Sequence, residues 1–142
     1  MATSKSPRLL LDTHIWLRYQ GISGAVRISS LPILHKAAEE GALFISVISI
    51  WELALLVKRG RLSLNTHVGR WTEEALSKQG INLLAFTPEI AIDSVNLPQP
   101  VHKDPADRIL IASARVERMT LVTRDRDVLD FAVRTHLAHL RA

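Results

Sequence analysis

The chain has 142 residues, 47% of them hydrophobic, and a formal net charge of +4 from 18 Lys and Arg against 14 Asp and Glu, which favours one globular domain with a sizeable core. It has no cysteine, which excludes disulfides, iron–sulfur clusters and a thiolate nucleophile, and no apolar run of the roughly 18–20 residues that a membrane span needs. We therefore expect a protein of the cytoplasm, without a membrane partner, whose modest basic excess suits a polyanion such as RNA or DNA.

Short apolar runs alternate with helical patterns along the chain. After a polar N-terminal extension, residues 1–7, the run at 8–12 predicts a buried strand that ends at Asp12, with Asp12 or Thr13 capping the next helix. Further strands are predicted at 42–45, 81–86 and 120–123. Helices are predicted after residue 13, from Pro32 to Gly41, over 46–59, 66–78, 88–95 and 105–118, and as a turn near Val128 and Leu129. The tail from Arg134 fits either a strand or a helix.

The predicted strands are continuous apolar runs rather than alternating ones. This pattern indicates an α/β fold with a parallel sheet that is covered by helices on both faces. In open sheets of this kind, sites lie beyond the carboxyl ends of the strands. Asp12 and Asp125 both stand at such ends, so we expect them to meet.

Four carboxylates lie beside strongly apolar runs, namely Asp12, Glu52, Asp107 and Asp125. A buried carboxylate needs a partner, and a cluster of them needs a cation, because an unpaired buried charge is costly. The chain has no cysteine and its histidines lack zinc-like spacing, so such oxygen ligands suit Mg²⁺ or Mn²⁺. If the four acids meet, they predict metal-assisted hydrolysis of a phosphodiester.

Three of these acids also have a simple structural interpretation at a helix start. Asp12 could cap the helix after its strand, and Asp125 could do the same, with Asp127 as a nearby substitute. Asp104 suits the N-cap of the helix at 105–118, and Asp107 suits its first turn. Both interpretations can hold if Asp104 caps while Asp107 points into the crevice. Arg108 could pair with either acid.

Glu52 is the only acidic residue of the predicted helix 46–59, which is apolar on nearly every face and is therefore expected to be buried all round. Glu52 could form an ion pair with Arg59 or another cation, or it could line a polar cavity. The tryptophans lie at helical positions among apolar neighbours, where we expect core packing rather than base stacking for Trp16, Trp51 and Trp71.

Four segments lie between about residues 8 and 127. They are Leu9-Leu10-Leu11-Asp12-Thr13-His14, Ser46-Val47-Ile48-Ser49-Ile50-Trp51-Glu52-Leu53-Ala54 with Lys58-Arg59-Gly60-Arg61-Leu62, His102-Lys103-Asp104-Pro105-Ala106-Asp107-Arg108-Ile109-Leu110-Ile111-Ala112, and Leu121-Val122-Thr123-Arg124-Asp125. Together, and in family order, these segments resemble the signature motifs of PIN domains. The resemblance is greatest to VapC-type toxins of bacterial toxin–antitoxin pairs. Ala106 replaces a family position that is often aromatic, and the tail from Arg134 is not typical of the family's last strand.

The resemblance implies a single PIN domain over 1–142 with a parallel sheet flanked by helices. It implies a cytoplasmic endoribonuclease that needs Mg²⁺, with Mn²⁺ as a substitute, and hydrolyses RNA through a metal-activated water. It places Asp12, Glu52, Asp107 and Asp125 in the acidic pocket as catalytic residues and metal ligands. It also implies a homodimer and a small antitoxin whose chain occupies the site, often with an arginine.

Other residues and two rival functions remain open at this stage. Thr13 or Thr123 could position a water or phosphate, and Lys58, Arg59 and Arg61 could hold RNA or be solvated helix-end charges. One rival is a nuclease-fold module that only binds a partner. The other is a phospho-receiver domain, which would need an acid after the strand at 81–86, where the chain has Phe86-Thr87.

Overall fold

The computed structural model describes residues 7–98 and 104–142. Most of the N-terminal extension lies outside the described residues, as do His102 and Lys103, which open the third PIN-like motif. None of the described helices is long and apolar enough to cross a membrane.

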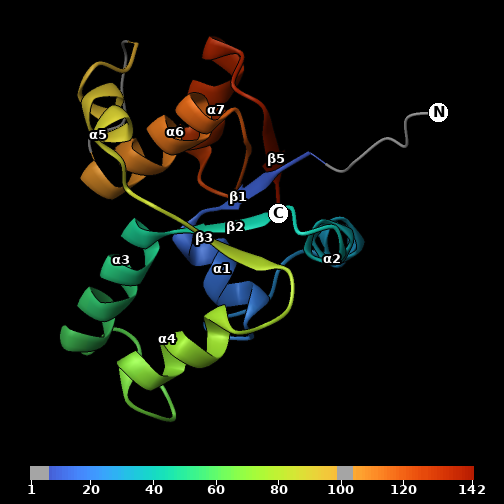
Figure 1. Cartoon of the computed structure of the whole chain (residues 1–142), viewed down its shortest axis with the longest axis vertical. Helices are drawn as coiled ribbons and strands as arrows, with labels where there is room; N and C mark the ends of the chain where they lie inside the picture. Colours follow the sequence, from blue (N-terminus) through green and yellow to red (C-terminus); the bar gives the residue numbers. More distant parts are fainter. Residues whose placement is uncertain (1–6, 99–103) are drawn as a thin grey trace.

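A five-stranded sheet, with every strand parallel, forms the centre of the molecule (Figure 1). Its strands, in sheet order, are β3 (Ile81–Leu84), β2 (Leu43–Ser46), β1 (Leu9–Leu11), β4 (Thr120–Thr123) and β5 (His139–Arg141). The register pairs Leu11 of β1 with Ile45 on one side and with Val122 on the other. The carboxyl ends of β1, β2 and β4 therefore lie at one edge of the sheet, as predicted.

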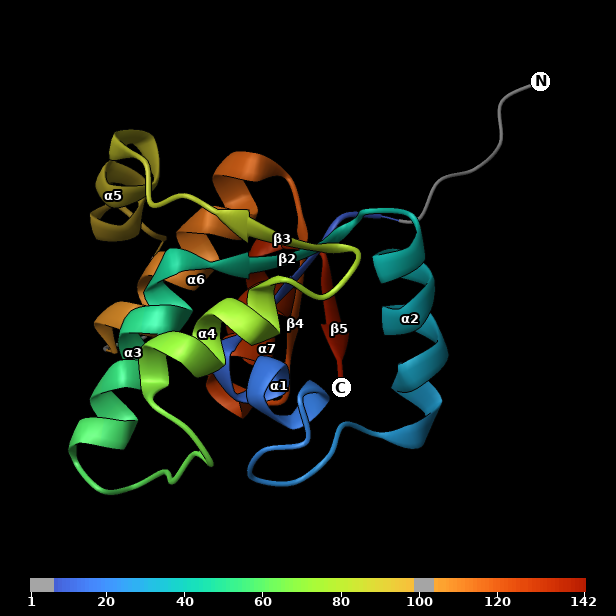
Figure 2. The ribbon, with the colours of Figure 1, turned by 60° about the horizontal axis from the view of Figure 1, so that its bottom comes forward.

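Helices cover both faces of this sheet (Figures 1 and 2). One face carries α1 (Thr13–Tyr19), α2 (Leu31–Glu39), α3 (Val47–Lys58) and α4 (Val68–Leu76), with the short 3₁₀ helix η1 (Ile28–Ser30) before α2. The other face carries α5 (Pro88–Val95), α6 (Pro105–Glu117) and α7 (Arg126–Thr135). The predicted class, a parallel α/β domain with two covered faces, is confirmed.

Strand β1 explains why its sequence is apolar without alternation. All three of its residues are buried, with Leu9 and Leu11 in the core under α1–α4 and Leu10 in the core under α5–α7. Successive side chains of a strand point to opposite faces, so a strand covered on both sides needs an apolar residue at every position.

The tryptophans divide into two buried residues and one exposed residue. Trp16 is fully buried and meets Trp71, which is 9% exposed, edge to face at 5.5 Å between ring centroids, so core packing is confirmed for both. Trp51 is 57% exposed, and its predicted core role is wrong. The prediction that the helix at 46–59 is buried all round is also wrong. Helix α3 lies at the rim of the fold and buries fully only Ser49 and Leu53.

The C-terminal part has more regular structure than the sequence indicated. The predicted helical turn is the ten-residue helix α7, which ends where His136 adopts a left-handed conformation with φ 58°. The ambiguous tail is a strand, β5, which pairs with β4 through Val122 and Leu140. Because β5 is the edge strand, and because His139 and Arg141 are exposed, it lacks the apolar run that revealed the other strands.

Candidate functional site

The loops after β1 and β4 bring Asp12 and Asp125 to the same edge of the sheet. The backbone N–H of Asp12 donates to Val122 O at 2.9 Å, which continues the β1–β4 pairing up to the acid. Helix α3 follows β2 and carries Glu52, while the first turn of α6 carries Asp107. All four predicted acids therefore lie at the carboxyl end of the sheet, where sites of α/β proteins form.

Asp12 is both a helix cap and a member of this group. Its Oδ1 accepts from the backbone N–H of Ile15 at 2.8 Å, which makes Asp12, not Thr13, the N-cap of α1. Its Oδ2 accepts from the hydroxyl of Thr123 at the end of β4. Burial raises the pKa of Asp12, and these two hydrogen bonds partly oppose the rise. Only Oδ1 takes part in the helix cap, while Oδ2 is bonded to Thr123 at the end of β4.

Glu52 is held by hydroxyl groups rather than by a cation. The Thr13 hydroxyl donates to Glu52 Oε1 and lies 2.8 Å from the Ser49 hydroxyl. Since a hydroxyl has one proton, Ser49 must donate to Thr13 when Thr13 donates to Glu52. Burial raises the pKa of Glu52, with a further rise from the charges of Asp104 and Asp12. The alternative of an ion pair with Arg59 is not found.

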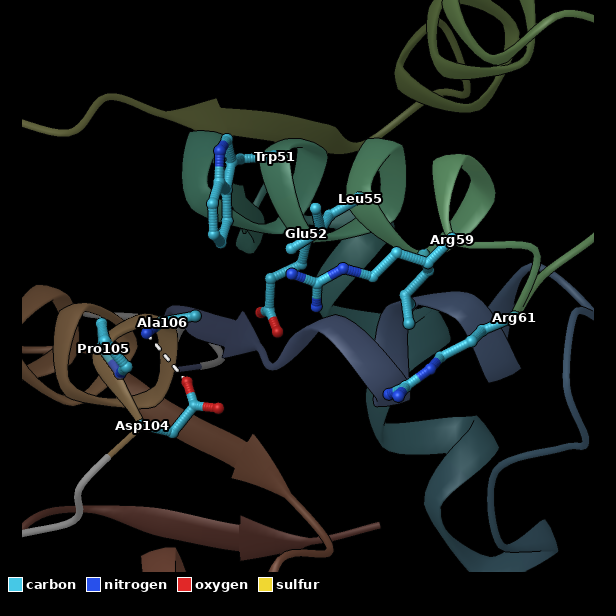
Figure 3. A pocket seen from close by; sticks show the side chains of 9 residues that line it. Trp51, Glu52, Leu55, Arg59, Arg61, Asp104, Pro105 and Ala106 are labelled. Carbon is cyan, nitrogen blue, oxygen red and sulfur yellow. Dashed lines mark hydrogen bonds between the residues drawn. The ribbon is translucent and has the colours of Figure 1, made fainter.

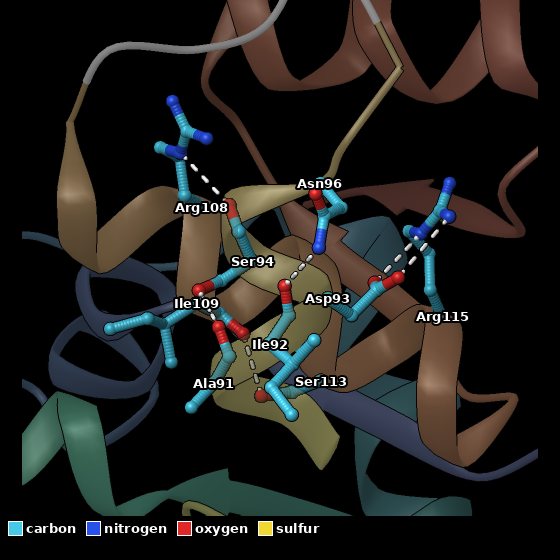
Figure 4. Close-up of polar contacts among 9 residues, drawn as sticks. All are labelled: Ala91, Ile92, Asp93, Ser94, Asn96, Arg108, Ile109, Ser113 and Arg115. Atoms are coloured by element: carbon cyan, nitrogen blue, oxygen red, sulfur yellow. Dashed lines mark hydrogen bonds and ion pairs between the residues drawn. The ribbon is translucent and has the colours of Figure 1, made fainter. Parts of the chain in front are cut away.

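At the start of α6, Asp104 caps the helix and Asp107 interacts with the other acids, which is one of the arrangements that the sequence allowed. Asp104 is the N-cap, and its Oδ1 accepts from the N–H groups of Ala106 at 2.9 Å and Asp107 at 3.2 Å. Asp107 is half-buried, and the negative charges of the other three acids act on its carboxylate. Arg108 does not pair with either acid. It donates instead to the carbonyl of Ser94 at 3.0 Å (Figure 4) and to that of Val95 at 3.3 Å, and both bonds tie α6 to α5.

Asp125 is exposed and caps α7 through the N–H of Val128 at 3.1 Å. Its own N–H donates to the Thr123 hydroxyl at 3.1 Å, so Thr123 bridges Asp125 and Asp12. Asp127 lies in the first turn of α7 and is exposed, which separates its position from that of Asp125.

The four acids interact electrostatically. Burial, and then the negative charges of Asp104, Glu52, Asp125 and Asp12, raise the pKa of Asp107 to about 7. Within the described ranges, no three Asp, Glu or His side chains are close enough to hold a metal ion as they stand. Mg²⁺ usually takes one or two carboxylates and keeps several waters, so this all-oxygen group fits such an ion without a tighter cluster.

The raised pKa of Asp107 predicts how the metal-free protein responds to pH. Its ordinary value is 3.8, so between about pH 4 and pH 7 the folded state holds a proton that the unfolded state has lost. The free energy of unfolding therefore falls as pH rises through this range. Asp107→Asn is expected to raise the melting temperature in EDTA by a few °C at pH 8 and by little at pH 4, with partial exposure limiting the gain.

A matched control for this melting experiment is Asp93→Asn. Asp93 is partly buried on α5 and pairs with Arg115 at 3.0 Å (Figure 4). Its removal breaks an ion pair instead of relieving repulsion, so the variant is expected to gain no stability at pH 8. A lower melting temperature for Asp107→Asn at pH 8 would show that this carboxylate is mainly structural.

A cleft of about 320 Å³ opens beside the acids, between α3 and the start of α6 (Figure 3). In this view Glu52 points into the cleft, with Arg59 reaching toward it and Asp104 on the opposite side. The lining residues are Trp51, Glu52, Leu55, Leu56, Arg59, Arg61, Asp104, Pro105 and Ala106. Lys58 does not line this cleft, but Arg59 and Arg61 do, so two acids, Glu52 and Asp104, and two guanidinium groups share it.

The sequence did not reveal the roles of three residues near the acids, Ser49, His14 and Trp51. Ser49 supports Glu52 through Thr13, and it stands one helical turn earlier on α3, a spacing that could have revealed it. His14 is exposed and lowers the pKa of both Asp12 and Glu52 by its positive charge. Trp51 lines the cleft, and its apolar neighbours in the sequence concealed its exposure.

A parallel α/β domain with acids grouped at the carboxyl ends of its strands is the class that this fold and site define. The PIN domain family matches residues 9–134, so the chain belongs to the PIN domain family. The chain is also similar to Ribonuclease VapC22 of Mycobacterium tuberculosis, with 30% identity over 118 residues that cover 83% of this chain and 87% of that protein. The resemblance noted in the motifs is confirmed.

Two solved structures extend the comparison. A toxin–antitoxin complex from Klebsiella pneumoniae aligns with TM-score 0.57 and 26% identity, covering 82% of this chain and 86% of that chain. VapBC2 from Rickettsia felis, bound to a DNA fragment from its promoter, aligns with TM-score 0.68 over 94% of this chain and 97% of that chain. At 18% identity the second likeness shows the fold alone.

Proposed function

We propose that this protein is an endoribonuclease of the VapC type and that Asp12, Glu52, Asp107 and Asp125 are its catalytic acids. The observation that carries the proposal is the grouping of these carboxylates at one edge of the sheet, where burial, and then the negative charges of Asp104 and the other three acids, raise the pKa of Asp107 to about 7. Membership of the PIN domain family and similarity to a ribonuclease support the same conclusion.

Mg²⁺, or Mn²⁺ in its place, is the proposed cofactor, and the four acids are the residues that would hold it. When bound, such a cation supplies charge neutralisation at phosphoryl oxygens and lowers the pKa of a coordinated water. Thr123 and Thr13 act as positioning residues, because their hydroxyls fix the carboxylates of Asp12 and Glu52. Burial and the neighbouring negative charges both disfavour the ionised form of Asp107, and a bound positive charge offsets both, so the site favours a cation.

RNA is the proposed substrate, and a cognate antitoxin is the proposed partner. The net charge of +4 and the guanidinium groups of Arg59 and Arg61 favour a polyanion at the cleft. The similar Klebsiella pneumoniae structure is a toxin–antitoxin complex, which supports an antitoxin partner here. We also propose that residues 1–142 form one PIN domain, that it acts as a homodimer, and that it works on RNA in the cytoplasm.

The test is cleavage of a mixed-sequence single-stranded RNA by the purified protein in Mg²⁺, with DNA of the same sequence as a control. Internal cuts in the RNA, and little cleavage of the DNA, are expected. RNA binding without any cleavage would favour the rival of an inactive nuclease-fold module. The phospho-receiver rival finds no support, because Ala85 and Phe86 follow β3 where that function needs an acid.

A further inference from the structure

Trp51 is an exposed tryptophan directly beside a candidate catalytic acid. It leaves 57% of its surface in solvent, whereas Trp16 is fully buried and Trp71 is 9% exposed. Binding clefts are typically lined by apolar and aromatic side chains with a few polar groups, and this cleft combines Trp51, Leu55 and Leu56 with charged groups. Trp51 immediately precedes Glu52, and both line the same cleft, where Pro105 and Ala106 form the opposite wall (Figure 3).

The charges in this cleft narrow the kind of ligand that Trp51 could contact. The cleft holds the carboxylates of Glu52 and Asp104 and the exposed guanidinium groups of Arg59, at the end of α3, and Arg61, just beyond it. Neither forms an ion pair with any acid among the described residues. A second copy of this chain would have to bury both like charges, whereas a nucleic-acid backbone neutralises them. At the α3 end of the cleft, where Arg59 and Arg61 lie, charge complementarity therefore favours RNA over a dimer contact.

We propose that Trp51 is the base-stacking platform of the site and that Arg59 and Arg61 neutralise the RNA backbone beside it. An indole stacks on the face of any base, while a duplex base already has both faces covered by its neighbours. Stacking on Trp51 therefore requires an unpaired base in the bound RNA. This inference rests on the proposed ribonuclease function, and it adds a determinant of affinity for single-stranded RNA.

Tryptophan fluorescence provides a direct measurement, since Trp51 is much more exposed than the other two tryptophans. In an Asp12→Asn background, which prevents cleavage, a short oligouridylate is expected to quench the exposed indole and to shield it from acrylamide. An abasic oligoribonucleotide of equal length is expected to do neither. Trp51→Ala is expected to weaken oligouridylate binding roughly 10- to 100-fold and to leave abasic binding unchanged. Trp51→Phe is expected to retain most of the affinity.

Two matched controls separate stacking from other effects. Ile92→Ala removes another exposed apolar side chain, on α5 and outside the lining of the cleft, and is expected to leave RNA binding unchanged. Arg59→Gln is expected to weaken oligouridylate and abasic binding alike, while Arg70→Gln, on α4, changes neither. In the active protein, Trp51→Ala is expected to raise KM for RNA with little change in kcat.

Three results would overturn the inference. They are unchanged binding of oligouridylate by Trp51→Ala, an equal loss for the abasic probe, and a shift of Trp51→Ala from dimer to monomer that accounts for weaker binding. If the active protein cleaves RNA but Trp51→Ala binds RNA as tightly as the wild type, the stacking role of Trp51 is rejected and the ribonuclease function is retained. Fluorescence quenching that depends on the bases, together with no cleavage by the unsubstituted protein in Mg²⁺, would support the stacking role of Trp51 and reject the ribonuclease function.

Discussion

Replacing any one of Asp12, Glu52, Asp107 or Asp125 with its amide is expected to reduce RNA cleavage at least about 100-fold. Substitutions of residues that merely orient metal ligands typically cost 10–100-fold, so loss of a ligand is expected to cost about 100-fold or more. The amides keep the size of each side chain and remove its charge. The measurement is the single-turnover rate for a labelled RNA in Mg²⁺, with folding checked by thermal melts.

The caps in this structure make the amide variants informative. Asp12 and Asp125 accept the N–H groups that begin α1 and α7, and asparagine caps helices about as well as aspartate. Asp12→Asn and Asp125→Asn are therefore expected to keep the fold. A large loss of cleavage with an unchanged melting curve would assign the effect to the lost charge.

Asp104→Asn is the matched control within the third motif. Asp104 caps α6 through two backbone N–H groups, a role that asparagine can also fill, so this variant is expected to keep most of its activity. Asp107 stands three residues later and interacts electrostatically with the other acids. An inactive Asp104→Asn together with an active Asp107→Asn would reverse the assignment of these two residues.

The main outline of the fold and site could be predicted because burial leaves a local mark on the sequence. A strand covered on both faces reads as an unbroken apolar run, and Leu9 to Leu11 followed by Asp12 shows where the run stops and polar chemistry starts. The parallel order of β1 and β4 then places Asp12 beside the loop that holds Asp125. The prediction needed only strand ends, which the sequence marks clearly.

Other features depend on contacts between distant segments. The link from Thr123 to Asp12 spans β4 and β1, and the exposure of Trp51 depends on where α3 lies at the rim of the fold. Strand β5 is half-exposed, so it carries no apolar run, and its pairing with β4 decides its structure. Local periodicity contains no information on these contacts, which explains the wrong predictions for Trp51 and for the burial of α3.

Removal of divalent cations is expected to abolish RNA cleavage. With EDTA the four acids repel one another without a neutralising charge, and the phosphoryl group has no Lewis acid beside it. Addition of Mg²⁺ or Mn²⁺ in excess is expected to restore cleavage. Ca²⁺ is expected to bind but to support little turnover, because it takes more ligands than Mg²⁺, at longer distances and in a more flexible geometry. Full cleavage in EDTA would exclude the metal mechanism.

The same cations are expected to stabilise the folded protein, which gives a readout that is independent of cleavage. A ligand at 100 times its Kd that binds only the folded state adds about 2.7 kcal/mol, so Mg²⁺ is expected to raise the melting temperature by several °C. In Asp107→Asn the metal-free protein is expected to melt higher than wild type, and the increase with Mg²⁺ is expected to shrink. These opposite changes follow from one cause, since the repulsion that destabilises the metal-free site is what a cation relieves. If Mg²⁺ raises the melting temperature of Asp107→Asn as much as that of the wild type, the cation does not bind at Asp107.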